Sequence, residues 1–195
     1  MEILNKNIDG KFYAKKVLKK IYPLSQDFLY KFNRRPSLAV IIVGDNPASK
    51  IYVKNKIRVA EENNIQSIEI TLPAQTSEEE LLKRIDSLNK EVEVDGILVQ
   101  LPLPKHISEQ KVINMISPEK DVDGFHPINF GKLYMGIPNF IPCTPLGCLY
   151  MIKNEVRDLN GKSAVIIGRS NIVGKPMASL LLSSNCTVTI THSKT

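Results

Sequence analysis

The chain has 195 residues, 43% of them hydrophobic, and carries a formal net charge of +6 with an isoelectric point near 9.2. This length allows one large domain or two small ones, and the hydrophobic content is ample for a packed core. The charge favours anionic partners, but it is dispersed along the chain without an aromatic and glycine nucleic-acid signature, so we expect no nucleic-acid partner.

The cysteines of the chain bear on whether the protein is found in an oxidising or a reducing compartment. There are three, Cys143, Cys148 and Cys186. Their odd number and wide spacing argue against a secreted disulfide framework, and a zinc site that combines Cys143 and Cys148 with a histidine is a remote alternative. The first ten residues lack the apolar core of a signal peptide, and no apolar run approaches the ~20 residues of a membrane span. We therefore expect a cytoplasmic protein with no metal and no membrane contact.

Helices and strands are predicted to alternate through the first hundred residues. Residues 10–22 have helical spacing of apolar side chains, and Pro23 should end or kink this helix before a second piece at 26–32. An apolar run at 37–43 is typical of a strand covered on both faces. The next predicted elements are a helix that Ser49 caps and that ends near Asn63, a strand at 66–72, a helix from the Ser77 and Glu80 capping box to about 89, and a strand at 95–100. This order predicts a parallel α/β sheet whose ligands bind at the carboxyl ends of its strands.

The predicted elements beyond position 100 are less regular. A short helix at 109–116 precedes a polar, turn-rich stretch at 118–124, and residues 125–141 are expected to be irregular. Thr144 and Pro145 suit the cap and the first position of a helix that runs to about 156. The last predicted elements are a strand at 163–167, a helix at 176–184 and a strand at 186–191. We place a domain boundary before them, which divides the chain into residues 1–160 and 161–195.

The stretch 162–176 is the first candidate binding site. An apolar strand that breaks at Gly168 and leads through small polar residues into a helix suits a nucleotide phosphate, because the amides and the dipole of a helix N-terminus attract anions. Its glycines depart from the usual dinucleotide fingerprint, since Ser170 replaces the second one and Gly174 comes one residue late. On spacing alone, nucleotide binding and an ordinary strand-turn-helix connection are equally good interpretations.

Five polar residues could carry chemistry, although each also has an ordinary structural interpretation. Tyr52 and Lys56 share one helix face, and such pairs are more often a surface contact than a site. Gln100 ends an apolar strand, where it could mark only the end of that strand. Asp121 and Asp123 most often belong to a turn that bonds its own backbone, with a metal loop as a distant alternative.

Taken together and in this order, several stretches resemble a known family. They are residues 47–56 (PASKIYVKNK), 95–104 (DGILVQLPLP), 118–125 (PEKDVDGF), 142–147 (PCTPLG) and 168–176 (GRSNIVGKP). The sequence closely resembles the bifunctional methylenetetrahydrofolate dehydrogenase and methenyltetrahydrofolate cyclohydrolase family. The resemblance implies an N-terminal three-layer α/β substrate domain with a parallel sheet, followed by a Rossmann-type NADP-binding domain.

The resemblance also implies roles for individual residues. It makes Lys56 the key catalytic group, oriented by Gln100, and it places Asp123 against the pterin ring of a folate substrate. A positioned lysine could accept and donate the protons that hydrolysis of a methenyl compound requires. The substrate-binding residues that it implies are Tyr52, which would stack on the folate, together with Ser49, Val99, Leu101 and Pro102.

NADP is the expected cofactor on two grounds. NAD sites usually carry an acidic side chain after the second strand, whereas here the strand is followed by His192, Ser193 and Lys194. Arg169 and Ser193 suit the 2′-phosphate of NADP instead, and the resemblance points the same way. The cofactor-binding residues that it implies are Gly168, Arg169, Ser170, Ile172 and Ser193.

The function that the resemblance implies belongs to one-carbon metabolism and purine biosynthesis. It is NADP-dependent oxidation of 5,10-methylenetetrahydrofolate to the 5,10-methenyl compound, followed by hydrolysis to 10-formyltetrahydrofolate. Family members continue past position 195, so we expect an incomplete cofactor domain in this chain, and a homodimer where that domain is complete. Two alternatives stay open: a catalytically impaired chain that binds folate or a partner subunit, and a basic nucleic-acid-binding protein.

Overall fold

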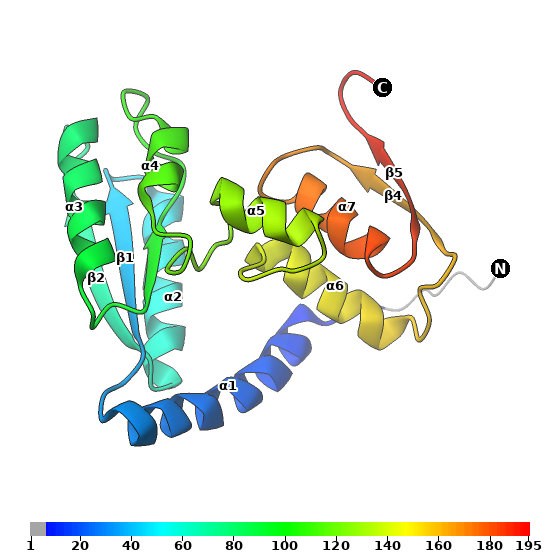
Figure 1. Cartoon of the computed structure of the whole chain (residues 1–195), viewed down its shortest axis with the longest axis horizontal. Coiled ribbons are helices and arrows are strands. Elements are labelled where there is room, and N and C mark those ends of the chain that lie inside the picture. Colours follow the sequence, from blue (N-terminus) through cyan, green and yellow to red (C-terminus); the bar gives the residue numbers. More distant parts are fainter. Residues whose placement is uncertain (1–6) are drawn as a thin grey trace.

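The computed structural model describes residues 7–195, which form two α/β units connected by a long helix, α1 (Gly10–Phe32) (Figure 1). The elements of the first unit are β1 (Ser37–Val43), α2 (Pro47–Glu62), β2 (Gln66–Leu72), α3 (Glu78–Lys90), β3 (Gly96–Val99) and α4 (Glu109–Met115). The elements of the second unit are α5 (Pro127–Tyr134), α6 (Cys143–Glu155), β4 (Ser163–Ile167), α7 (Gly174–Leu182) and β5 (Thr187–Thr191).

The first unit confirms the predicted three-layer arrangement around a parallel sheet. The strand order is β2-β1-β3, and β1 pairs in parallel with both neighbours. Ile41 and Val43 of β1 face a core that α3 and α4 complete, whereas Val40 faces the opposite side, where it meets Val53 of α2. Because both faces of β1 are covered, its side chains are apolar without alternation.

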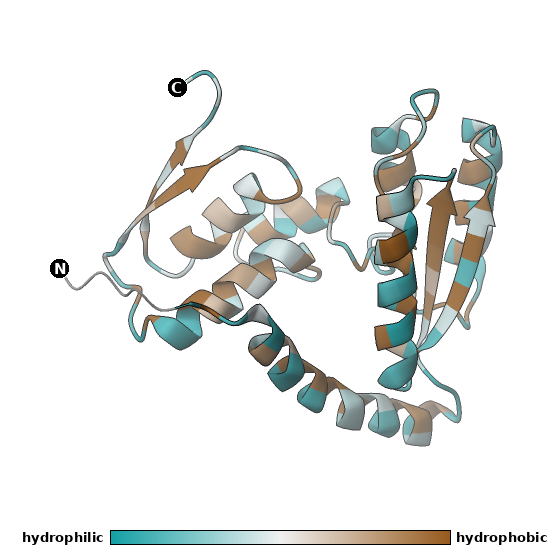
Figure 2. Cartoon of the chain, turned by 180° about the vertical axis from the view of Figure 1, so that it is seen from behind, coloured by the Kyte–Doolittle hydropathy of each residue, from teal (hydrophilic) through white to brown (hydrophobic). Residues whose placement is uncertain are grey.

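The second unit has its own core, between helices and the parallel pair β4-β5. Leu133 of α5, Leu149 of α6 and Leu180 of α7 meet in this core. The other face of β4 is open, since Val165 and Ile167 are 66% and 91% exposed, and Figure 2 shows this apolar strand at the edge of the molecule. Helices α5 and α6 thus pack with the second sheet, while the division of the chain at residue 160 stays a prediction.

Helix α1 is held at both ends by different units. The Tyr13 hydroxyl donates to a Glu155 carboxylate oxygen at 2.5 Å, and the Tyr13 ring lies 5.9 Å from the Tyr150 ring between centroids, both partners belonging to α6. At the other end, Arg34 binds Asp95 of the first unit. Within residues 7–195, no helix combines the length and the apolar character needed to cross a membrane.

Two expected breaks in helical structure are wrong. Pro23 does not end the first helix, because α1 continues through it to Phe32, and the anchors at both ends favour one continuous helix. The alternative expectation, a kink at Pro23, stays a prediction. The stretch 125–141 is not irregular throughout, since it contains α5. His126 Nδ1 caps α5 by accepting from Ile128 N at 3.1 Å, and Pro127 occupies the first turn.

Two predicted caps are also wrong, whereas a third is confirmed. Asn46, not Ser49, caps α2, and its Oδ1 accepts from Ser49 N at 3.1 Å. Helix α6 begins at Cys143, so Thr144 lies inside its first turn and makes no cap hydrogen bond within the described chain. Ser77 caps α3 as expected, with its Oγ accepting from Glu80 N at 3.2 Å.

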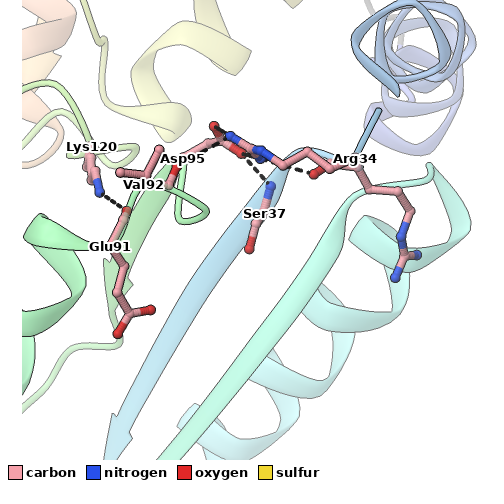
Figure 3. A network of polar contacts seen from close by, with 7 residues as sticks. Arg34, Ser37, Glu91, Val92, Asp95 and Lys120 are labelled. Carbon is pink, nitrogen blue, oxygen red and sulfur yellow. Dashed lines mark hydrogen bonds and ion pairs between the residues drawn. The ribbon is translucent and has the colours of Figure 1, made fainter. Parts of the chain in front are cut away.

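An ion pair fixes the amino-terminal edge of the first sheet (Figure 3). The Arg34 guanidinium donates to both Asp95 carboxylate oxygens at 2.7 and 2.8 Å, and Ser37 N–H donates to the same carboxylate at 2.8 Å. Desolvation raises the pKa of Asp95, but the Arg34 and Ser37 hydrogen bonds outweigh it, and the net pKa is lowered. This carboxylate therefore ties α1 to the starts of β1 and β3.

Replacing Asp95→Asn should destabilise the protein by about 1–2 kcal/mol near neutral pH, because charge-assisted bonds at a partly exposed site are weakened. Since the pKa of Asp95 is lowered on folding, its contribution is present above the ordinary aspartate pKa and is lost as the pH falls through the lowered value. Urea unfolding should show a difference from the parent that narrows at acid pH. The control Asp86→Asn removes an exposed carboxylate that pairs with Lys90, and an equal loss there would contradict this account.

Candidate functional site

The carboxyl ends of β1 and β3 meet at one edge of the first sheet. Gln100 N–H, one residue past β3, donates to Ile41 O of β1 at 2.8 Å and extends the strand pairing into the loop. Gly44, which follows β1, has a φ of 85°, a left-handed conformation that favours glycine in the turn toward α2. Both loops thus start from fixed points at the edge where parallel α/β sheets bind ligands.

Lys56 and Gln100 form a hydrogen bond across this edge. Lys56 Nζ donates to Gln100 Oε1 at 3.0 Å, and Gln100 Nε2 donates to Leu101 O at 2.7 Å. The second bond fixes the orientation of the amide, so that its oxygen faces the ammonium group. The structure therefore brings together two predicted residues that belong to different elements, one on α2 and one after β3.

Asp123 joins this pair. It lines a narrow apolar crevice whose walls include Val99, Leu101 and Phe125. Burial raises the pKa of the Asp123 carboxyl, the Lys56 ammonium opposes this shift, and a neighbouring carboxylate adds to it. The three residues predicted as catalytic thus share one electrostatic environment.

Cys143 belongs to the same environment, although no role was predicted for it there. Cys143 is the first residue of α6, and its Sγ lies 3.9 Å from Val122 O. Protein atoms around the thiol raise its pKa even though part of the side chain is exposed, the Asp123 carboxylate raises it further, and Lys56 opposes both effects. The sequence feature that could have indicated this thiol is the PCTP stretch at 142–145. It was used as part of the family resemblance, but no role was drawn from it for the cysteine.

The predicted substrate-binding residues differ in their accessibility. Val99 and Leu101 line the crevice, and Tyr52 is 63% exposed one helical turn before Lys56. Pro102 is also exposed, after a cis Leu101–Pro102 peptide bond, whereas Ser49 is buried. Tyr52 is therefore available for stacking, and the roles of all five residues stay predictions.

The connection between β4 and α7 has the strand-turn-helix geometry that the sequence predicts. Gly168 N–H donates to Thr191 O at 2.8 Å, and its φ of 121° favours glycine. A Cβ on Gly174 would collide with Gly168 O, so this close approach also requires glycine. The N–H groups of Val173 and Gly174 donate to Ser170 Oγ at 3.1 and 3.2 Å. Ser170 thus occupies amides that were expected to face a phosphate, and an anion would have to be bound by the loop of residues 169–172.

The remaining predicted cofactor residues are exposed at the carboxyl edge of the second sheet. Ile167 pairs with Thr191 in parallel register, so the loops that carry Arg169 and Ser193 leave the sheet side by side. Ile172 is exposed in the same connection. Their roles toward a cofactor stay predictions. Among the described side chains, no three His, Cys, Asp or Glu gather as metal ligands.

The chain matches known proteins along nearly its whole length. Family models for the catalytic domain and the NAD(P)-binding domain of tetrahydrofolate dehydrogenase/cyclohydrolase match residues 8–123 and 142–195, respectively. Curated relatives named bifunctional protein FolD, from Erythrobacter litoralis and Listeria innocua, are 52% and 54% identical over 188 residues, which is 96% of this chain. The chain spans 63% and 66% of the lengths of these two relatives.

Solved structures give the same result. The crystal structure of the bifunctional FolD methylenetetrahydrofolate dehydrogenase/cyclohydrolase from Campylobacter jejuni matches with a TM-score of 0.93 and 48% identity, covering 96% of this chain and 67% of that one. The Trypanosoma brucei FolD structure, complexed with NADP cofactor and an inhibitor, matches with a TM-score of 0.92 and 34% identity, covering 97% of this chain and 65% of that one. Because one family accounts for both units and for their fold, the chain belongs to the tetrahydrofolate dehydrogenase/cyclohydrolase family.

Proposed function

We propose that this chain provides the folate site and part of the dinucleotide site of a bifunctional enzyme of one-carbon metabolism. The enzyme oxidises 5,10-methylenetetrahydrofolate with NADP and hydrolyses the resulting methenyl compound to 10-formyltetrahydrofolate. The observation that carries the proposal is the 3.0 Å bond between Lys56 Nζ and Gln100 Oε1 beside Asp123. Membership of the family supports the choice of substrate.

The folate binds against the crevice that Asp123 lines. The Asp123 carboxyl suits the adjacent N–H donors of a pterin ring, because a carboxyl group can bind two such donors side by side. Val99 and Leu101 border this crevice, which has room for no more than about one water molecule, so the ring would lie at its mouth. The exposed Tyr52 can stack on the aromatic part of the substrate. This orientation brings the bridging carbon of the folate toward Lys56.

The oxidation step depends on positioning and electrostatics, since a hydride leaves the bridging carbon and a methenyl cation remains. The hydrolysis step needs proton transfer. In its neutral amine form, Lys56 accepts a proton as water attacks the methenyl carbon, and it returns that proton to N5 as the bond between that carbon and N5 breaks. The remaining hydroxyl proton passes to solvent as the formyl C=O forms, so the whole step releases one proton. Gln100 holds Nζ for both transfers through the observed hydrogen bond.

NADP is the cofactor that the second unit fits. Three features of the connection between β4 and α7 suit a dinucleotide. Gly168 has a positive φ, the backbone at Gly174 approaches Gly168 O too closely for a side chain, and the loop between them is exposed. Arg169 offers a planar cation for the 2′-phosphate, with the Ser193 hydroxyl on the neighbouring loop. When bound, NADP supplies the nicotinamide that accepts the hydride. The Trypanosoma brucei relative was solved with NADP, which supports this assignment.

We place this enzyme in the cytoplasm, as a homodimer that serves purine biosynthesis. Cys143, Cys148 and Cys186 are free thiols in the described chain, which suits a reducing compartment. The homodimer rests on the family resemblance, in which the cofactor domains pair.

Replacing Lys56→Met should slow methenyltetrahydrofolate hydrolysis by roughly 10²- to 10⁴-fold, the usual contribution of a positioned proton-transfer group. The loss of the methenyl absorbance measures this rate against the buffer-catalysed background. Lys54→Met, which removes an exposed lysine of the same helix, should retain the parent rate. A parent chain no faster than buffer would refute the activity, and an active Lys56→Met variant would refute the role of the lysine.

The parent chain should bind NADP more tightly than NAD, and Arg169→Ala should weaken NADP binding by about tenfold, because a charge-assisted phosphate contact is lost. NAD affinity should change little, since NAD lacks the 2′-phosphate. Calorimetric titration of both nucleotides measures the difference. Lys162→Ala, at the start of β4 and away from the loop, serves as the control. Equal weakening of both nucleotides by Arg169→Ala would contradict the assignment.

Replacing Asp123→Asn should weaken folate binding and at the same time raise the melting temperature near neutral pH. Because burial raises the pKa of this carboxyl, the folded protein loses stability as the pH rises from the ordinary aspartate pKa through the raised value. The gain from asparagine should therefore vanish below about pH 4. Asp45→Asn, at an exposed carboxylate that pairs with Lys50, should give no gain. An unchanged melting temperature for Asp123→Asn at neutral pH would count against this account.

A further inference from the structure

Two polar side chains are buried beside the turn that carries Asp123, and one of them, Asp121, lines the same crevice. Asp121 and Asn129 are 2% and 0% exposed, and the functional proposal uses neither. Asp121 Oδ2 accepts from Asn129 Nδ2 and from the backbone N–H of His126, each at 2.9 Å. Asn129 Nδ2 also donates to Pro118 O at 2.9 Å. The Asn129 amide and the Asp121 carboxylate together thus connect both ends of the segment 118–126.

This segment is also fixed by neighbouring elements. Asp121 forms an isolated parallel bridge with Ile97 of β3. Gly124 N–H donates to Asp121 O at 3.1 Å, and a Cβ on Gly124 would lie only 3.0 Å from the Pro142 nitrogen that precedes α6. The turn between these points therefore has little freedom, and it holds the Asp123 side chain beside the crevice.

Asn129 lies on α5, a helix that is held in place by packing in the second core. Leu133, one helical turn later, is 3% exposed in the second core, and its carbonyl accepts from Ser179 Oγ of α7 at 3.2 Å. A side chain on an element fixed by packing positions its partners better than one on a free loop. Asn129 Oδ1, however, is buried without a hydrogen-bond partner among residues 7–195. The role of Asn129 in this structure is therefore carried by the two bonds that Nδ2 donates, to Pro118 O and to the Asp121 carboxylate.

We propose that Asn129 is a positioning residue of the folate site: it holds Asp121, and through it the turn that presents Asp123 to the substrate. The inference rests on the proposed function, because it assigns Asp123 to folate binding. Asn129 supplies two N–H donors from one nitrogen to Pro118 O and to the Asp121 carboxylate. Aspartate lacks these donors, alanine has none, and serine has only one.

A double-mutant cycle tests whether Asn129 acts through Asp123. We expect Asn129→Ala to raise the Kd for 5-formyltetrahydrofolate, a stable folate probe, by about tenfold in the parent chain. In the Asp123→Asn background, the same substitution should change the Kd by less than about twofold, because the group that it positions is already altered. An equal factor in both backgrounds, or no change in the parent, would overturn the proposal.

Two further variants separate positioning from general destabilisation. Asn63→Ala removes another buried asparagine, whose Nδ2 donates to Val59 O at 2.7 Å at the far end of α2. It should lower the melting temperature without changing the Kd. Asn129→Ser keeps one donor and should give an intermediate Kd, and it carries the cycle if Asn129→Ala does not fold. A Kd change for Asn63→Ala as large as that for Asn129→Ala would count against positioning.

A measurement without folate distinguishes failure of this inference from failure of the proposed function. Carboxyl carbon NMR follows the titration of Asp123, which faces the charged or titratable groups of Lys56, Asp121 and Cys143. Asn129→Ala should move this titration toward that of an ordinary aspartate, because the loosened turn admits water. If the parent binds no folate but the titration moves, the proposed function fails and the positioning of Asp123 stands. An unmoved titration in a parent that binds folate refutes the positioning.

Discussion

The backbone bond from Gln100 N–H to Ile41 O marks the point where β3 leaves the first sheet. Up to that point the chain is constrained by parallel pairing with β1, and beyond it the Gln100 side chain is able to meet Lys56 of α2. A slip of one residue in this register would turn Gln100 to the opposite face of the sheet and would break the contact. The paired strands also bury apolar side chains on both faces of β1, so the core supports the strand ends that carry these loops. The geometry of the candidate site therefore depends on the packing of the core beneath it.

Two aspartates at opposite edges of this sheet differ in how the protein compensates their charge. Asp95, at the amino-terminal edge, is bound by a guanidinium and a backbone N–H that lower its pKa despite desolvation, so its charge stabilises the fold. Asp123, at the carboxyl edge, lacks comparable compensation, and burial raises its pKa. The second arrangement lowers stability at neutral pH, as is common for groups that must remain available to a ligand.

The parts of this structure that could be predicted from sequence are those that local patterns specify. The apolar run of β1 and the Ser77 cap needed only neighbouring residues, and the strand-helix alternation gave the parallel sheet. Pro23 was misleading because the continuity of α1 comes from contacts at both of its ends. Helix α5, and with it Asn129, was missed because a short helix takes much of its stability from packing. Lys56, Gln100 and Asp123 came from the family resemblance, since no periodic pattern indicates that residues so far apart in sequence converge, and their roles stay predictions.

Helix α1 also constrains how this protein can vary. Its anchors, Tyr13 on one unit and Arg34 on the other, are separated by roughly 30 Å of helix at about 1.5 Å per residue. One inserted residue would shift an anchor by that rise and rotate it by about 100° around the helix axis. Exposed positions such as Tyr30 can change without moving either unit, whereas the number of residues cannot. The number of residues in this helix, more than the identity of most of its side chains, therefore sets the spacing between the two units.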